Sequence, residues 1–263
     1  MSRIEKRFSA LKEQGRKGLI IYVNSGYPDY EITYEAVLAM AAAGADVIEL
    51  GLPFSDPMAD GPVIQKAATE ALAKGATTAK ALDLAKRIRQ QSDVPLAVMT
   101  YVNTILNQGV EKFVQDFAAA GIDGLIAPDV PAEEAALLQG PCQSAGMDLI
   151  SFVAPTTDAA RLPGLCRQAS GFIYCIATTG VTGVRQTDYS AIGKVIQSVR
   201  SQTKLPLAIG FGIGSPEAAV AAAQHADAVI VGSAVVKLLA QEGVDAAAAF
   251  VASVRQALDE GRC

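Results

Sequence analysis

The fold is decided by a stretch that reads Ala43-Gly44-Ala45-Asp46-Val47-Ile48-Glu49-Leu50. Its glycine is typical of a helix C-terminus, and its aspartate stands directly before a short apolar run that predicts a strand. The same junction returns as Ala120-Gly121-Ile122-Asp123 and, in shorter form, as His225-Ala226-Asp227. Each copy again precedes an apolar run. The chain is therefore predicted to repeat a unit in which a helix leads into a buried strand.

Outward from residues 43–50, short apolar runs alternate with longer segments of helical period over the whole chain. Two of these segments, 110–117 and 192–199, carry apolar residues at the spacing i, i+3, i+4, i+7. Buried strands that alternate with helices favour a parallel sheet. The eight predicted strands are 19–23, 47–50, 96–100, 124–127, 149–153, 172–176, 207–211 and 228–231.

The length of the repeat separates two architectures. Eight units in 263 residues give about 33 residues each, close to the repeat of a closed barrel. The alternative, an open doubly wound sheet, usually carries Gly-x-Gly-x-x-Gly after its first strand, where this chain has Asn24-Ser25-Gly26-Tyr27-Pro28. We therefore predict an α/β protein with one domain over residues 1–263, folded as a single (β/α)8 barrel. An extra N-terminal helix and long loops after the second and sixth strands complete the prediction.

Composition excludes several kinds of partner. With 22 basic and 27 acidic side chains and no cluster of Lys and Arg, we expect neither nucleic acid nor a membrane as partner. No apolar stretch reaches the 18 or so residues of a membrane-spanning helix. The first eight residues do not resemble a secretory signal, so we expect a cytoplasmic protein. Four cysteines without a Cys-x-x-Cys pair, and one histidine, favour reduced thiols over disulfides or a zinc site.

Glu49 is the first candidate catalytic residue. Side chains alternate along a strand, so Ile48 and Leu50 would face the helices while Val47 and Glu49 would face the barrel interior. Active sites of such barrels lie at the C-terminal ends of the strands, and burial there raises the pKa of a carboxyl group. The alternative is a Glu paired with a buried base, but no predicted strand contains Lys or Arg.

Asp60 is the second candidate, in the long connection 53–62 that follows the same strand. It could reach the same pocket in ionised form. The alternative is a turn aspartate, because Asp-Gly-Pro is a strong turn signal. Asp56 has the same ambiguity, and Asp129, in a Pro-Asp-Val-Pro sequence, reads better as a structural residue.

Three glycine-rich stretches follow the last three predicted strands. They are Gly180-Val181-Thr182-Gly183, Gly210-Phe211-Gly212-Ile213-Gly214-Ser215 and Gly232-Ser233. Barrel loops after the seventh and eighth strands bind phosphate through backbone N–H groups, and glycine permits the close approach. The alternative is that these glycines serve helix packing or capping.

What the chain lacks narrows the chemistry. No lysine stands at the end of a predicted strand, so a Schiff-base aldolase would have no nucleophile. One histidine leaves a metal aldolase without its usual ligands. The chemistry that is left is acid–base catalysis by carboxyl groups on a small phosphate ester, in which the substrate itself serves as the electron sink.

The stretch 48–65 resembles the signature of the tryptophan synthase α subunit family, and the resemblance extends over nearly the whole chain. That family is a single TIM barrel that cleaves indole-3-glycerol phosphate to indole and glyceraldehyde 3-phosphate. The supporting stretches are Gly26-Tyr27-Pro28, Met99-Thr100-Tyr101-Val102-Asn103, Pro128-Asp129-Val130-Pro131, Gly180-Val181-Thr182-Gly183, Gly210-Phe211-Gly212-Ile213 and Gly232-Ser233-Ala234-Val235-Val236-Lys237.

The resemblance implies a role for each candidate. Glu49 would move protons to the indole C3 and from the glycerol hydroxyl, and Asp60 would stabilise positive charge at the indole nitrogen. The residues lining the indole pocket would be Tyr22, Ile64, Met99, Tyr174 and Phe211. The residues holding phosphate would be Gly183, Gly212, Gly232 and Ser233.

The resemblance also implies a partner and a lid. The partner would be a pyridoxal-phosphate β subunit that receives indole in an α2β2 assembly, and this chain itself would hold no cofactor. The lid, 177–184, would close on the Asp60 loop with Thr182 as its latch. Two departures from the family pattern stand out: Ala177-Thr178-Thr179 occupies the place of the usual lid arginine, and Asn24-Ser25 replaces a threonine followed by a small or apolar residue.

Two other functions fit the same residues. One is a stand-alone indole-releasing lyase without a β partner. The other is a non-catalytic subunit that only activates a β chain, although the paired Glu49 and Asp60 argue against it.

Overall fold

All eight apolar runs form strands, each within one residue of the predicted bounds at either end. The computed structural model describes residues 1–177 and 189–261. Short continuous apolar runs were sufficient for this prediction, because a strand enclosed by helices is apolar on both faces. The strands are β1 Gly18–Asn24, β2 Val47–Gly51, β3 Leu96–Met99, β4 Gly124–Ile126, β5 Asp148–Val153, β6 Ile173–Ile176, β7 Leu207–Gly210 and β8 Ala228–Val231.

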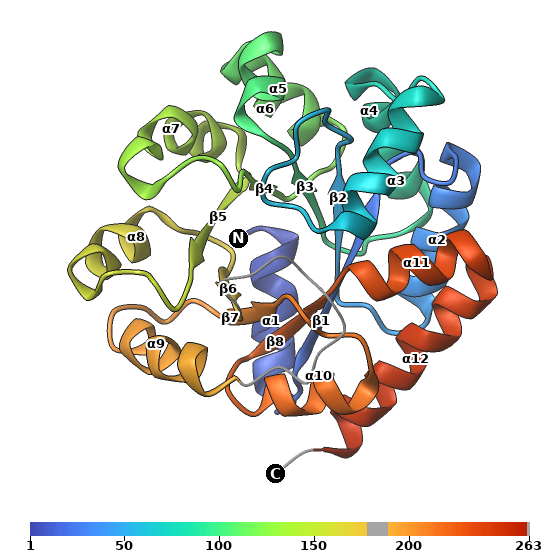
Figure 1. The fold of residues 1–263 in the computed structure, drawn as a ribbon. Coiled ribbons are helices and arrows are strands. Elements are labelled where there is room, and N and C mark those ends of the chain that lie inside the picture. Colours follow the sequence, from blue (N-terminus) through green and yellow to red (C-terminus); the bar gives the residue numbers. More distant parts are fainter. Residues whose placement is uncertain (178–188, 262–263) are drawn as a thin grey trace.

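The strands pair in chain order as one closed parallel barrel, which confirms the predicted (β/α)8 fold. Closure is made by β1 and β8, where Gly18 pairs with Ala228 and Ile21 with Val231. Figure 1 shows the ring of strands surrounded by helices, with α1 lying across the barrel. All strands point the same way, so their C-terminal ends meet on one face of the molecule.

The helices include the predicted N-terminal one, but several units carry two helices where the sequence suggested one. Gly75 and Gly109 adopt left-handed backbone angles, with φ of +78° and +87°, and each ends one helix just before the next. The helical elements are α1 Arg3–Glu13, α2 Tyr30–Ala42, α3 Pro62–Ala73, α4 Thr78–Gln91, α5 Val102–Gln108, α6 Val110–Ala119, η1 Ala132–Glu134, α7 Ala136–Ala145, η2 Ala159–Arg161, α8 Leu162–Gln168, α9 Ser190–Arg200, α10 Pro216–Ala223, α11 Ser233–Gln241 and α12 Val244–Glu260.

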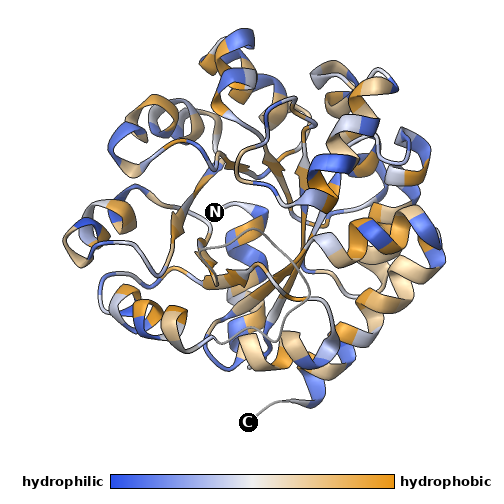
Figure 2. Ribbon diagram, in the orientation of Figure 1, coloured by the Kyte–Doolittle hydropathy of each residue, from blue (hydrophilic) through white to orange (hydrophobic). Residues whose placement is uncertain are grey.

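Two apolar cores lie on the two faces of the barrel wall. Ile48 and Leu50 of β2 pack outward against the helices, and Val47 packs inside the barrel, as the alternation predicts. The inner core also receives Phe8 of α1, which closes the N-terminal end of the barrel. Figure 2 shows the same arrangement as apolar strands and helices whose apolar faces turn inward. No helix in the described ranges has the length and hydropathy that crossing a bilayer requires.

In the repeated junction that decides the fold, the aspartate exchanges two hydrogen bonds with a residue at the start of a strand. In the first copy, the Leu19 N–H donates to the Asp46 carboxylate at 2.8 Å, and the Asp46 N–H donates to the Leu19 carbonyl at 2.7 Å. Asp123 makes the same two bonds with Leu96 of β3. The aspartate thus fixes the start of one strand beside the start of the next.

The third junction repeats this exchange, and each carboxylate meets an arginine. Asp227 exchanges the same pair of bonds with Leu207 of β7. The guanidinium groups of Arg255, Arg89 and Arg200 donate to Asp46, Asp123 and Asp227 at 3.2, 3.0 and 3.0 Å, respectively. The two buried carboxylates, those of Asp46 and Asp123, are thereby compensated at the end of the barrel opposite the candidate site.

Candidate active site

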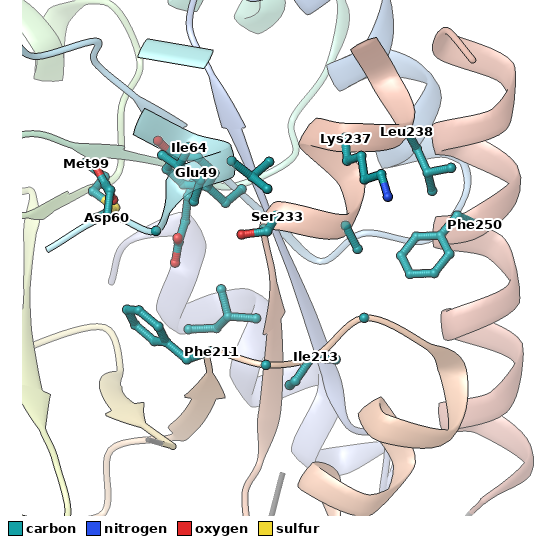
Figure 3. Close-up of a pocket in the computed structure, with 18 of the residues that line it drawn as sticks. Glu49, Asp60, Ile64, Met99, Phe211, Ile213, Ser233, Lys237, Leu238 and Phe250 are labelled. Atoms are coloured by element: carbon teal, nitrogen blue, oxygen red, sulfur yellow. The ribbon is translucent and has the colours of Figure 1, made fainter. Parts of the chain in front are cut away.

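A cavity of about 470 Å³ opens at the C-terminal ends of the strands. Side chains from β1, β2, β3 and β6 meet there with the loop after β2 and the loops after β7 and β8. Figure 3 shows Glu49, Asp60 and Phe211 among the residues that line it. Ten of the twelve predicted site residues line it: Tyr22, Glu49, Asp60, Ile64, Met99, Tyr174, Phe211, Gly212, Gly232 and Ser233. The other two, Thr182 and Gly183, lie outside the described residues, as does most of the predicted lid.

Glu49 projects from the middle of β2 into the cavity, on the side of Phe211 (Figure 3). The side chain is buried, and its Oε1 atom has no hydrogen-bond partner among residues 1–177 and 189–261. Burial raises the pKa of Glu49 from 4.5 to about 8, because water no longer solvates the charged form. At neutral pH this carboxyl group carries a proton that it can give to a ligand.

Asp60 is held at the edge of the same cavity by a tight loop. Its N–H donates to the Pro57 carbonyl at 3.0 Å, and the Gln65 amide donates to its carbonyl at 2.9 Å. Burial raises the pKa of Asp60 to about 6, while a hydrogen bond from Tyr101 opposes that rise. Asp60 is therefore mostly ionised at neutral pH while Glu49 is mostly neutral.

Tyr101 is a site residue that the sequence analysis did not single out. Its hydroxyl donates to Asp60 Oδ2 at 3.1 Å and accepts from the Ala59 N–H at 3.0 Å. Its ring stacks on Phe54, with centroids 5.1 Å apart. The residue stands in the quoted stretch 99–103, but its role depends on the loop after β2 folding back over β3, which no local pattern reveals.

The cavity wall between the carboxyl groups is aromatic and apolar. Tyr22 pairs across the sheet with Glu49, and Tyr174 lies with its ring centroid 6.1 Å from that of Phe211. Burial raises the pKa of both tyrosines well above 10, and the nearby carboxylates add to the effect. These walls suit a flat apolar ring.

Two glycines at strand ends make room for these tyrosines. A Cβ atom on Gly51 would stand 2.1 Å from the Tyr22 hydroxyl, and one on Gly210 would stand 2.4 Å from the Tyr174 hydroxyl. Neither distance is possible for real atoms. Gly210 was predicted as part of a phosphate loop, and the structure gives it this packing role as well.

The opposite side of the cavity is built from backbone. Phe211 and Gly212 both have positive φ, +75° and +81°, which turns the chain sharply after β7. α11 begins at Ser233, with Gly232 as its N-cap, and its first backbone bond runs from the Val236 N–H to the Gly232 carbonyl. The earlier N–H groups have no acceptor within the helix, which favours an anion there.

The remaining sequence candidates lie elsewhere. Asp129 accepts two bonds from the Val102 N–H, at 3.0 and 3.1 Å, and so caps α5, as its structural reading predicted. Asp56 is exposed and does not line the cavity. Asn24 and Ser25 are buried at the end of β1 but also lie outside the cavity lining. Cys142, Cys166 and Cys175 are buried and unpaired, as the reduced state predicts.

Fold and cavity together define a class of protein. A (β/α)8 barrel with a neutral and an ionised carboxyl group at the C-terminal ends of its strands has the arrangement of a general acid–base enzyme. The aromatic walls favour an apolar ring, and the unbonded N–H groups at the start of α11 favour an anionic group.

Comparison with known proteins specifies the family. The family model described as tryptophan synthase alpha chain matches residues 8–260. The chain is 50% identical to the tryptophan synthase alpha chain of Gluconacetobacter diazotrophicus, covering 94% of this chain and 90% of the relative. It is 45% identical to that of Citrifermentans bemidjiense, covering 99% of both chains. The chain belongs to the tryptophan synthase alpha chain family.

A solved structure agrees with this assignment. A chain in a structure of Mycobacterium tuberculosis tryptophan synthase superposes with a TM-score of 0.92 at 35% identity, covering 98% of each chain. The family resemblance seen in the sequence is thereby confirmed. The family is one of lyases, so the chain is predicted correctly as an enzyme of that class.

Proposed function

We propose that this chain cleaves indole-3-glycerol phosphate to indole and glyceraldehyde 3-phosphate, with Glu49 and Asp60 as its catalytic residues. The single observation that carries the proposal is the contrast between these two groups. Glu49 is buried, its Oε1 atom has no hydrogen-bond partner in the described part of the chain, and its pKa is about 8. Asp60 is bonded to Tyr101 and has a pKa of about 6. One cavity thus offers a proton donor beside an anion.

The reaction follows from these charges. Neutral Glu49 gives its proton to the indole C3, which leaves positive charge at the ring nitrogen. Asp60, already ionised, stabilises that charge, and its bond from Tyr101 keeps it oriented. The bond between C3 and the glycerol chain then breaks, and its electron pair enters the ring. Glu49 takes the proton of the neighbouring glycerol hydroxyl as the carbonyl forms, which restores its starting state.

Binding follows the two walls of the cavity. The indole ring would lie among Tyr22, Tyr174 and Phe211, where apolar surface is removed from water. The phosphate would accept bonds from backbone N–H groups near Gly212 and Ser233. By family resemblance Thr182 would contact Asp60, and the backbones of Gly183 and Gly232 would also hold the phosphate. Ile64 and Met99 would complete the indole pocket.

The indole formed would pass to a pyridoxal-phosphate β chain in an α2β2 assembly, and this chain would hold no cofactor of its own. The cytoplasm is the proposed location. Family membership supports this partner. Co-purification with a β chain, together with indole release by the isolated chain, tests the assignment against the two alternative functions.

Glu49→Gln tests the chemistry. The amide keeps the shape of the side chain and removes the proton carrier, so kcat for indole release should fall at least about 10²-fold. Glu35→Gln, an exposed carboxyl group on α2, is the matched control and should leave kcat unchanged. Activity of Glu49→Gln within threefold of the unmodified chain would refute the assignment.

Asp60→Asn provides a second test of the proposed catalytic residues. It should lower kcat strongly while an analogue that cannot be cleaved still binds with nearly unchanged affinity. If the affinity for the analogue fell in step with kcat, Asp60 would be a loop-structuring residue and not a catalytic one.

A further inference from the structure

The cavity does not end at Ser233. It continues between α11, α12 and the connection from β7 to α10, where Ile213, Leu238 and Phe250 line it (Figure 3). Lys237 of α11 lines the same branch. Neither the proposed reaction nor the backbone phosphate site uses this lysine.

The position of Lys237 directs it toward the phosphate end. It stands four residues after Ser233, so the two side chains share one face of α11, a turn apart. Side chains of an α-helix lean toward its N-terminus, and a lysine stem is long enough to cover the preceding turn. Figure 3 shows the ammonium end of Lys237 in the space between Ser233 and Phe250.

Lys237 is also the one positive group facing the cavity within the described residues. The charged residues of that lining are Glu49, Asp60, Lys237 and Glu242. The Lys237 side chain is exposed, and none of the ion pairs and hydrogen bonds within residues 1–177 and 189–261 involves it. Glu242 faces the same branch without forming that pair. The ammonium group is therefore available to a ligand.

We propose that Lys237 binds the phosphate group of the substrate beside the backbone N–H groups at the start of α11 and so sets the preference for a phosphorylated ligand. The inference rests on the proposed function for the identity of the phosphate ester. Backbone N–H groups orient a phosphate but carry no net charge, whereas a hydrogen bond from an ammonium group is roughly twice as strong as a neutral one. Lysine is a common phosphate ligand for this reason.

Lys237→Gln tests the inference, because the substitution should change KM and leave kcat nearly unchanged. The amide keeps the length of the stem and removes the charge, so KM for indole-3-glycerol phosphate should rise about tenfold. The value of kcat should stay within twofold, because the reacting atoms lie at the Glu49 end. Lys237→Arg should restore most of the affinity. Lys12→Gln, which removes the same charge from α1 at the other end of the barrel, should change neither constant.

Direct binding separates this inference from the proposed function. Inorganic phosphate, titrated calorimetrically, should bind Lys237→Gln about tenfold more weakly than the unmodified chain, whereas indole should bind both equally. An unmodified chain that bound phosphate through Lys237 but cleaved nothing would refute the reaction alone. Equal phosphate affinity and equal KM in Lys237→Gln, or an equal loss of indole affinity, would overturn the role of Lys237.

Discussion

Two carboxyl groups in one cavity differ because their immediate surroundings differ. Glu49 emerges from β2, which pairs with β1 on one side and β3 on the other, and no donor of the described residues reaches its Oε1 atom. Asp60 lies in a loop, where the Tyr101 hydroxyl can bond to its charged form. Burial raises both pKa values, but the hydrogen bond limits the rise for Asp60. Separation of two pKa values in this way distinguishes the proton carrier, Glu49, from the anion that stabilises charge, Asp60.

We expect a bell-shaped dependence of kcat/KM on pH, with limbs near 6 and 8. Below pH 6 Asp60 gains a proton and no longer stabilises the ring cation; above pH 8 Glu49 loses the proton that the first step needs. Rates of indole release measured from pH 5 to pH 9 check this. A rate that stayed level across that range would contradict the two assigned pKa values.

Tyr101→Phe identifies the acid limb. Loss of the hydroxyl removes a bond that favours ionised Asp60, so the pKa of Asp60 should rise and the acid limb should move toward neutral pH. The alkaline limb belongs to Glu49 and should stay near 8. Movement of both limbs together would show that Tyr101 acts on the whole pocket.

Strands and helices are tied by contacts between distant parts of the chain. The aspartate of each repeated junction was visible in the sequence, because helix end, acid and strand are neighbours there. The arginine that pairs with this aspartate was not visible, because Arg255 and Asp46 are 209 positions apart in the sequence. The sequence likewise placed Glu49 in the lumen through alternation, but it could not connect Tyr101 with Asp60. Local periods predicted the elements, whereas contacts between elements needed the fold.

Arg255→Ala should destabilise the chain by about 3 kcal/mol. Both partners of the pair are buried, at 6% and 3% exposure, and removal of the guanidinium leaves the Asp46 carboxylate without its closest positive partner. Arg161→Ala, which breaks an exposed pair with Glu133 at 2.7 Å, should have a far smaller effect. Chemical unfolding of the two variants measures the difference. Equal losses would show that burial of the pair does not matter.

Gly51→Ala should damage the site without unfolding the barrel. The new methyl group would overlap the buried ring of Tyr22, which must then shift in the cavity beside Glu49. Displacement by about 1 Å can cost about 10²-fold in rate, so kcat/KM should fall at least tenfold. Gly140→Ala, in α7 with open space around it, is the control and should keep full activity. If both variants remained fully active, Tyr22 would have no part in positioning the ring.

At the scale of the whole molecule, the two ends of the barrel carry different tasks. The C-terminal end holds the cavity and Glu49, whose Oε1 atom is buried without a partner among the described residues, and such burial lowers stability. The N-terminal end holds the paired aspartates and the helix α1. Ser2 and Arg3 of this helix region bond to Asp148, at the start of β5, and to Asp123 of the second junction, respectively. Stability is thus concentrated away from the chemistry.

Phe8→Ala tests this division of tasks. Phe8 is 6% exposed inside the barrel end, with its ring centroid 5.9 Å from that of Phe172, so its removal leaves a void among strands that cannot collapse together. Unfolding experiments should show a loss of about 3 to 5 kcal/mol. Leu137→Ala, at a site 40% exposed on α7, should cost far less. Well below the unfolding temperature, kcat and KM of Phe8→Ala should match the unmodified chain. A fall in kcat of the folded variant would contradict this division. It would mean that α1 also shapes the Glu49 pocket, through the apolar core inside the barrel.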